Sequence, residues 1–155
     1  QTSSLRWNDT DPSSSVFTVG STADTNQDGT NIIAYSFAEK QGYSKFASYT
    51  GNGSSDGTFV YTGFKPAVLI YKNTSQSDEW FIHDNKRQGY NDDNEYLFPS
   101  STQAEGTINR IRLISNGFKA LDSDKGVNAD GNLYVYMAFA ENPFVTSTGI
   151  PGLAR

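Results

Sequence analysis

The residues best suited to recognise a ligand are concentrated in one polar stretch, residues 84–95. It combines a tyrosine with amides, carboxylates and two cations. Sugars are bound by that mixture, because pyranose C–H faces stack on aromatic rings while hydroxyls need paired donors and acceptors. A solvated surface loop is the alternative interpretation. The predicted ligand-binding residues are Lys86, Arg87, Tyr90, Asn91, Asp92, Asp93 and Asn94.

A second group of oxygen ligands lies in residues 122–131, where carboxylates recur at alternating spacing. The stretch does not match an EF-hand loop, which needs glycine at position six and a bidentate glutamate at position twelve. β-Sandwich lectins hold calcium in loops of this kind, so we predict a calcium site; solvated turn residues are the alternative. The predicted ligands are Asp122, Asp124, Asn128 and Asp130.

No catalytic arrangement can be assembled from the sequence. His83 is the single histidine and precedes Asp84, but the G-x-S-x-G motif of a nucleophile elbow is missing. Glycosidases need two carboxylates set ~5–10 Å apart, and no pair among the five glutamates can be placed face to face. We therefore expect a protein that is not an enzyme, with His83 paired to Asp84 or to a backbone carbonyl.

The composition favours an all-β domain on the outside of a cell or particle. Ser, Thr and Asn supply 45 of the 155 residues and aromatics 21, whereas glutamate supplies five. Helix-forming residues are therefore scarce, and strand- and turn-forming residues dominate. A net charge of −5 argues against nucleic-acid binding, which depends on neutralising phosphates. No apolar run approaches the ~20 residues of a membrane helix, so no membrane insertion is expected.

Short alternating segments separated by turn residues predict about ten strands and little or no helix. We expect an antiparallel β-sandwich of jelly-roll or concanavalin A-like type. The expected strands are 16–19, 32–38, 42–49, 59–62, 67–72, 79–83, 95–98, 107–114, 117–121 and 132–140.

An internal repeat divides the chain. Residues 26–39 align with 128–141 at a constant offset of 102, with six of fourteen positions identical. Both copies end in strands that are apolar on both faces, which is typical of central strands. We predict that residues 1–41 are closing strands of a preceding repeat unit packed into the same domain, and that residues 42–155 form a complete sandwich with a C-terminal tail at 142–155. A chance match of two hairpins that share an Asp-Gly turn is the alternative.

Several segments resemble a known family. They are Gly42–Gly53, Phe59–Ala67, Trp80–Arg87 and Tyr136–Phe144, followed by Thr148–Pro151 and a terminal Ala154-Arg155. These segments are similar to the C-terminal repeat of tail-fibre-like proteins of tailed bacteriophages, marine and cyanobacterial ones included. The resemblance implies a concanavalin A-like or jelly-roll sandwich on the virion surface. Its motifs contain no known catalytic residue, so it implies a location and not an activity.

The function expected from these observations is a lectin-like, non-catalytic module of a phage tail fibre or spike. It would bind a bacterial surface glycan or receptor and contact other virion proteins. We expect a homo-oligomer, with a trimer as one arrangement. A structural head-decoration or fibre-assembly protein without a ligand is the alternative, and a glycan-degrading enzyme ranks last.

Overall fold

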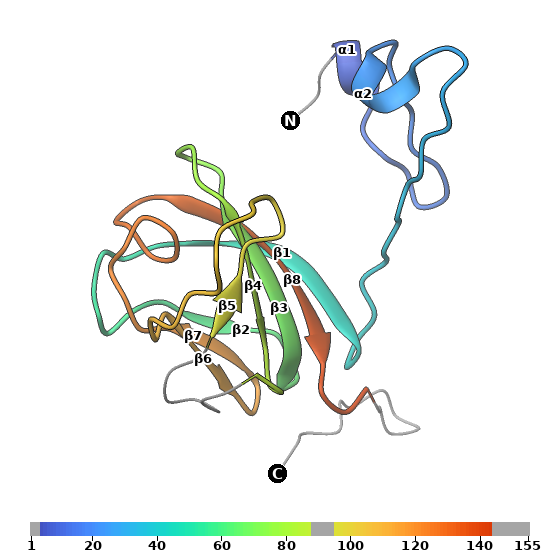
Figure 1. Ribbon diagram of the computed structural model, residues 1–155. Coiled ribbons are helices and arrows are strands. Elements are labelled where there is room, and N and C mark those ends of the chain that lie inside the picture. Colours follow the sequence, from blue (N-terminus) through green and yellow to red (C-terminus); the bar gives the residue numbers. More distant parts are fainter. Residues whose placement is uncertain (1–3, 88–94, 144–155) are drawn as a thin grey trace. The chain divides into compact units, whose positions relative to one another are not determined.

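The computed structural model describes residues 4–87 and 95–143, and the chain divides into two compact units (Figure 1). The first unit runs to Phe37 and the second begins at Ala38. Among the described residues, no helix is long and apolar enough to cross a membrane.

The second unit is built from two antiparallel sheets, which confirms the all-β fold (Figure 1). The five-stranded sheet has the order β1-β8-β3-β4-β5, and the three-stranded sheet has the order β2-β7-β6. The jelly-roll connectivity stays a prediction. The strands are β1 (Ser44–Thr50), β2 (Phe59–Tyr61), β3 (Pro66–Asn73), β4 (Trp80–Asp84), β5 (Tyr96–Leu97), β6 (Ile111–Ile114), β7 (Gly117–Ala120) and β8 (Leu133–Ala140).

The core of this unit is rich in tyrosine. The rings of Tyr49 and Tyr134 stack with centroids 4.9 Å apart, and Phe118 meets Tyr49 edge-on at 5.6 Å. The buried hydroxyls are satisfied: Tyr49 Oη donates to the carbonyl of Val127 at 2.7 Å, and Tyr134 Oη donates to that of Lys125 at 2.8 Å. The rings therefore fill the interior while their hydroxyls fix the loop that precedes β8.

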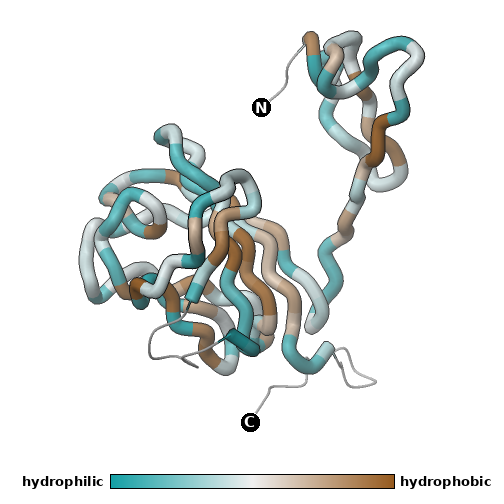
Figure 2. The backbone as a smooth tube through the Cα atoms, viewed as in Figure 1, coloured by the Kyte–Doolittle hydropathy of each residue, from teal (hydrophilic) through white to brown (hydrophobic). Residues whose placement is uncertain are grey.

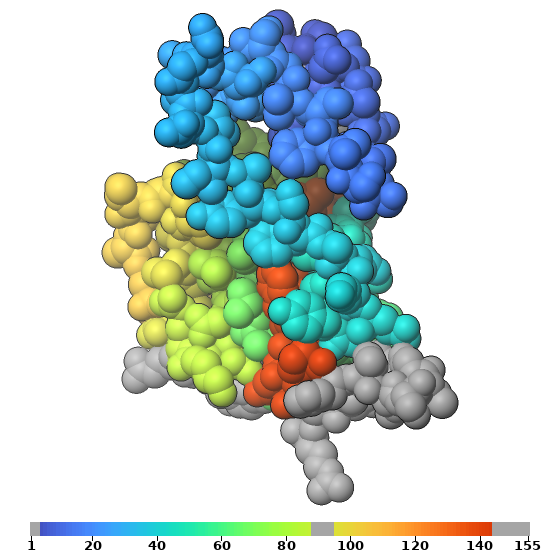
Figure 3. Space-filling view, turned by 90° about the vertical axis from the view of Figure 1, so that its right-hand side faces the viewer, coloured from blue at the N-terminus to red at the C-terminus, as the bar shows by residue number. Residues whose placement is uncertain are grey.

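β8 is a central strand, as its two apolar faces predicted. It pairs with β1 on one side and with β3 on the other, and Figure 3 shows it in orange-red between teal β1 and the green strands. Tyr134, Tyr136 and Ala138 point into the core and are 0–3% exposed. The intervening Val135, Met137 and Phe139 lie on the other face and are half-buried.

The first unit has no strand in its described residues, 4–37. It contains two helical turns, α1 (Ser4–Trp7) and α2 (Ala23–Asn26). The strands expected at 16–19 and 32–38 are therefore wrong, which leaves eight strands in the described chain instead of about ten. The physical reason is the lack of a paired neighbour, because an isolated extended segment gains neither ladder hydrogen bonds nor a buried face.

Apolar residues in the two units have different surroundings. Figure 2 shows brown, apolar residues along the strands of the sandwich and also in the first unit. In the sandwich these side chains form a core, whereas no described residue of the first unit is buried. The predicted packing of residues 1–41 into the same domain stays a prediction.

Candidate functional site

One end of the sandwich gathers the polar residues that could meet a ligand. β1 begins at Ser44, β8 ends at Ala140, β3 begins at Pro66 and β4 ends at Asp84. These strands are antiparallel neighbours, so the four ends lie along one edge of the sheet. The segments that follow or precede them, 39–45, 61–65 and 84–87, form what we call the strand-end site.

A polar pocket of about 510 Å³ lies in this site. Its wall is made by residues 39–42, 44–45 and 61–64. Tyr61 provides an aromatic ring that is 61% exposed, and Lys40 and Lys45 provide cations. Thr62 is buried, and its hydroxyl donates to the carbonyl of Phe64 at 2.6 Å, which fixes the turn that holds Tyr61.

Glu39 is the carboxylate of the pocket wall. It lies 3.4 Å from Lys45 Nζ, and its other oxygen accepts the backbone N–H of Phe46 at 3.4 Å. Burial, followed by the negative charge of Glu39, raises the pKa of Tyr136 to about 12. The Glu39 side chain is 52% exposed, so its oxygens remain accessible to a ligand beside Lys45.

At the same end of the sheet, Glu141 ties three strand ends together. Its carboxylate lies 2.8 Å from Lys65 Nζ and accepts Asn85 Nδ2 at 2.7 Å. The backbone N–H of Glu141 also donates to the carbonyl of Lys65 at 2.9 Å. Lys65 is only 8% exposed, so the bridge compensates its charge inside the protein and links the ends of β3, β4 and β8.

The first two residues of the predicted binding loop lie at the same end. The Asp84 carboxylate accepts the backbone N–H groups of Lys86 and Arg87 at 2.8 and 2.9 Å. Arg87 Nε also lies 2.7 Å from Asp84, and its guanidinium pairs with Glu105. Partial burial alone would raise the pKa of Asp84, but these donors outweigh it and lower that pKa. Lys86 is exposed.

The remaining predicted loop residues, Tyr90, Asn91, Asp92, Asp93 and Asn94, lie outside the described residues. The structure thus brings Lys86 and Arg87 to the same end of the sandwich as the pocket. The role of the whole loop in binding stays a prediction.

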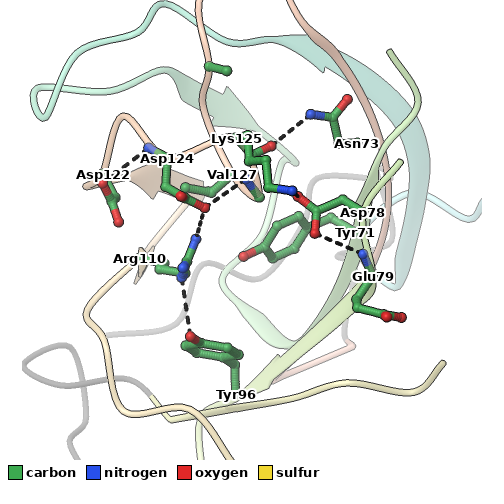
Figure 4. A network of polar contacts seen from close by, with 12 residues as sticks. Tyr71, Asn73, Asp78, Glu79, Tyr96, Arg110, Asp122, Asp124, Lys125 and Val127 are labelled. Atoms are coloured by element: carbon green, nitrogen blue, oxygen red, sulfur yellow. Dashed lines mark hydrogen bonds and ion pairs between the residues drawn. The ribbon is translucent and has the colours of Figure 1, made fainter. Parts of the chain in front are cut away.

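A second polar network surrounds Arg110 (Figure 4). Its guanidinium pairs with Asp124, and Nε donates to Tyr96 Oη at 3.3 Å. The same guanidinium lies over the rings of Phe81 and Tyr96, 5.5 and 5.4 Å from their centroids. Arg110 is 12% exposed in its side chain, so the network joins the two sheets rather than presenting a charge to a ligand.

The four predicted calcium ligands take up different contacts. Asp124 accepts the N–H of Gly126 at 2.8 Å besides pairing with Arg110, and Asp122 accepts the N–H of Asp124 at 3.1 Å. Asp130 is exposed. Within residues 4–87 and 95–143, no three acidic or histidine side chains come together as a metal site. Calcium binding stays a prediction.

Asn128 is a buried clamp. Its side-chain oxygen accepts the N–H of Asn52 at 3.1 Å and the hydroxyl of Thr58 at 3.1 Å. Its nitrogen donates to Asn52 Oδ1 at 2.7 Å and to the carbonyl of Ser54 at 2.8 Å. The amide therefore uses both ends to hold the loop between β1 and β2.

His83 is fully buried, with no exposed surface. Its Nε2 lies 3.2 Å from Tyr71 Oη, so the expected pairing with Asp84 or a backbone carbonyl is wrong. Nδ1 has no hydrogen-bond partner among the described residues. Burial, and then the positive charge of Arg110, lowers the pKa of His83 to about 3, so the imidazole is neutral in the folded protein.

Sequence reasoning missed the pocket wall and the Lys65–Glu141–Asn85 bridge. Glu39 and Glu141 could be seen only as equivalent strand-end residues of the repeat. Their different partners depend on the neighbouring strand ends, which have no local pattern in the sequence.

A family model described as a domain of unknown function, DUF7483, matches residues 1–143, and the chain belongs to this family. The match includes both the first unit and the strands of the sandwich. Comparison with curated proteins and with solved structures gave no significant match.

Proposed function

We propose that the strand-end site binds a saccharide on a bacterial surface, and that the chain is a lectin-like, non-catalytic attachment module of a phage tail fibre or spike. The observation that supports this most directly is the polar pocket of about 510 Å³ beside the exposed ring of Tyr61. An exposed ring next to paired donors and acceptors is the chemistry that a pyranose requires.

The charges around the pocket suit hydroxyl and acidic sugar groups. Lys40 and Lys45 are donors, Glu39 is an acceptor, and Gln41 is both. Lys86 lies exposed at the same end of the sheet. Among the described residues of the pocket wall, Glu39 is the single carboxylate, whereas glycosidases use two. Binding without hydrolysis is therefore the simpler interpretation.

The resemblance to tail-fibre-like proteins is the reason for proposing a bacterial surface as the target and a virion as the location. The segment Phe59–Ala67, which belongs to that resemblance, contains Tyr61 and Thr62 of the pocket wall. The segment Trp80–Arg87 leads into the predicted binding loop. The family motifs therefore coincide with two sides of the strand-end site.

A fibre-assembly role without a ligand is the second candidate. It is favoured by the first unit, whose described residues include many exposed apolar side chains and no buried ones. Large exposed apolar surface is typical of protein contacts.

The test is binding of the labelled chain to an array of bacterial lipopolysaccharides and capsular polysaccharides. Tyr61→Ala should weaken binding roughly tenfold, because ring stacking is lost. Phe59→Ala is the matched control: Phe59 is 48% exposed on the same strand but is not part of the pocket wall. It should leave binding unchanged.

Two further arms separate the alternatives. Tyr90→Ala with Asn91→Ala tests the predicted loop, and addition of EDTA tests calcium. A folded chain that binds neither the array nor whole bacteria would contradict the proposal and support the assembly role. Release of reducing sugar from a polysaccharide would instead show an enzyme.

A further inference from the structure

The first unit has more apolar surface than it can bury alone. Its large apolar side chains are between 38% and 81% exposed, and no described residue from 4 to 37 is buried. Such surface indicates a missing partner. The exposed residues on which this rests are Leu5, Trp7, Val16, Phe17, Val19, Ile32, Ile33 and Tyr35.

The end of this unit repeats the sequence of β8 and the turn before it. Residues 26–39 match residues 128–141 at six of fourteen positions. In the second copy these residues are the clamp Asn128, an Asp-Gly turn and the central strand of the five-stranded sheet. In the first copy the same pattern is not part of a strand.

The backbone repeats as well. In residues 22–26, the carbonyl of Thr22 accepts the N–H groups of residues 25 and 26 at 3.1 and 2.8 Å. In residues 124–128, the carbonyl of Asp124 accepts the N–H groups of residues 127 and 128 at 3.0 and 2.9 Å. These are the same positions at the offset of 102, so the helical turn before β8 is present in both copies.

The following turn agrees too. Gly29 has φ of 70° and Gly131 has φ of 69°, a conformation that favours glycine. The N–H of Thr30 donates to the carbonyl of residue 27 at 3.2 Å, and the N–H of Asn132 donates to that of residue 129 at 3.2 Å. The chain is therefore directed into the next segment in the same way.

A looser similarity, no longer at a constant offset, extends back to the residues that flank β6 and β7. The N–H of Gly20 donates to the carbonyl of Arg6 at 2.7 Å, as the N–H of Leu121 donates to that of Arg110 at 2.9 Å. Arg6 also pairs with Asp24 at 2.8 Å and Arg110 pairs with Asp124, so both arginines contact an aspartate of the following turn, although the two aspartates are not equivalent at the offset of 102. The two copies thus share the arginine contacts before the turn and the hydrogen bonds of the turn itself, whereas the described residues of the first copy form no counterpart of the paired strands β6, β7 and β8.

We propose that residues 5–39 are the closing part of another sandwich, and that their partner is a sandwich unit of this same fold that supplies the counterparts of β1 to β5. In this chain's own sandwich, β8 already occupies the position between β1 and β3. The proposed partner is therefore a different sandwich unit. The inference concerns assembly and does not depend on saccharide binding.

The register follows from β8. Ile32, Ala34 and Ser36 take the inward positions of Tyr134, Tyr136 and Ala138, which are 0–3% exposed. The exposed side chains of residues 33, 35 and 37 then lie on the outer face.

A fused chain tests the proposal while keeping residues 1–155 intact. If Arg6 is aligned with Arg110, residue 1 aligns with residue 105. A second copy of residues 42–104 can therefore be joined directly before residue 1. Amide hydrogen exchange of residues 32–38 is then compared between the fused chain and the unfused chain. We expect exchange at least ~100-fold slower in the fused chain, and a roughly twofold larger unfolding enthalpy.

Two single substitutions in the fused chain provide the control. Ser36→Asp places a charge where Ala138 is 0% exposed, and should abolish the protection of residues 32–38. Asn31→Asp places a charge where Leu133 is 43% exposed, and should preserve it. In both variants β8 should remain protected.

Fast exchange of residues 32–38 in the fused chain, with β8 still protected, would overturn the proposal. If the direct junction also disturbs β8, a short Gly-Ser linker at the junction is tested with the same readouts. Unprotected residues 32–38 in that second fusion would equally overturn it.

Discussion

Acidification should weaken the fold through His83, the chain's single histidine. The ring has no exposed surface and lies between Tyr71 and Tyr96, with centroids 5.7 and 5.5 Å away. Burial, and then the charge of Arg110, lowers its pKa to about 3. The folded protein therefore does not take up this proton until the pH is far below the ordinary pKa of about 6.5.

The sign follows from the difference between the two states. The unfolded chain binds the proton as the pH falls below about 6.5, and the folded chain does not, so stability is complete above that pH and declines toward pH 3. Between about pH 7.5 and about pH 5 the loss is about 2 kcal/mol. The pKa values of Asp84 and Asp124 are lowered, so these groups stay ionised in both states across that range.

Urea unfolding at the two pH values measures this loss. His83→Phe keeps a ring between Tyr71 and Tyr96 but removes the titration. It lowers stability at both pH values, because the Tyr71 hydroxyl loses its partner. The difference between the two pH values should shrink by about 2 kcal/mol. An equal pH difference in both proteins, or an imidazole that titrates near pH 6.5 in the folded state, would refute the reasoning.

Two further predictions use the repeat as its own control. Asn128→Ala should destabilise the protein by ~2–4 kcal/mol in urea unfolding. The substitution removes the hydrogen bonds that the amide oxygen accepts and those that the amide nitrogen donates. The exposed equivalent, Asn26→Ala, should change stability by less than ~0.5 kcal/mol; equal effects would contradict this. Arg110→Ala should lower the melting temperature, since its side chain is 12% exposed between two rings and Asp124. Arg6→Ala should not, because that side chain is 58% exposed.

The sequence predicted the sandwich well, because its strands have local signals. Alternating segments bounded by turn residues placed every strand from β1 to β8, and the two-faced pattern of residues 132–140 identified a central strand. Periodicity reports which faces of a segment can be buried. It does not report whether a neighbour is available, and the strands expected at 16–19 and 32–38 were wrong for that reason.

The candidate site was less predictable, because its residues come from separate strand ends. Lys86 and Arg87 were found from the composition of one loop, and they do lie at the pocket end of the sheet. Lys65, Glu141 and Asn85 are far apart in the sequence and meet only through the register of β3, β4 and β8. Asp124 looked like a metal ligand in a turn, but its partner Arg110 precedes β6 and could not be inferred from spacing.

Comparison of the two copies of the repeat distinguishes structure that forms from local sequence alone from structure that requires neighbouring strands. The helical turn and the glycine turn form in both copies with the same hydrogen bonds, so residues 22–30 need no partner to adopt them. The strand that follows forms only in the second copy, between β1 and β3. Turn geometry is therefore local, and strand formation depends on two neighbours. By this reasoning residues 32–38 already have the entry turn of a central strand, and the proposed partner sheet would supply the two neighbours that β8 has in the second copy.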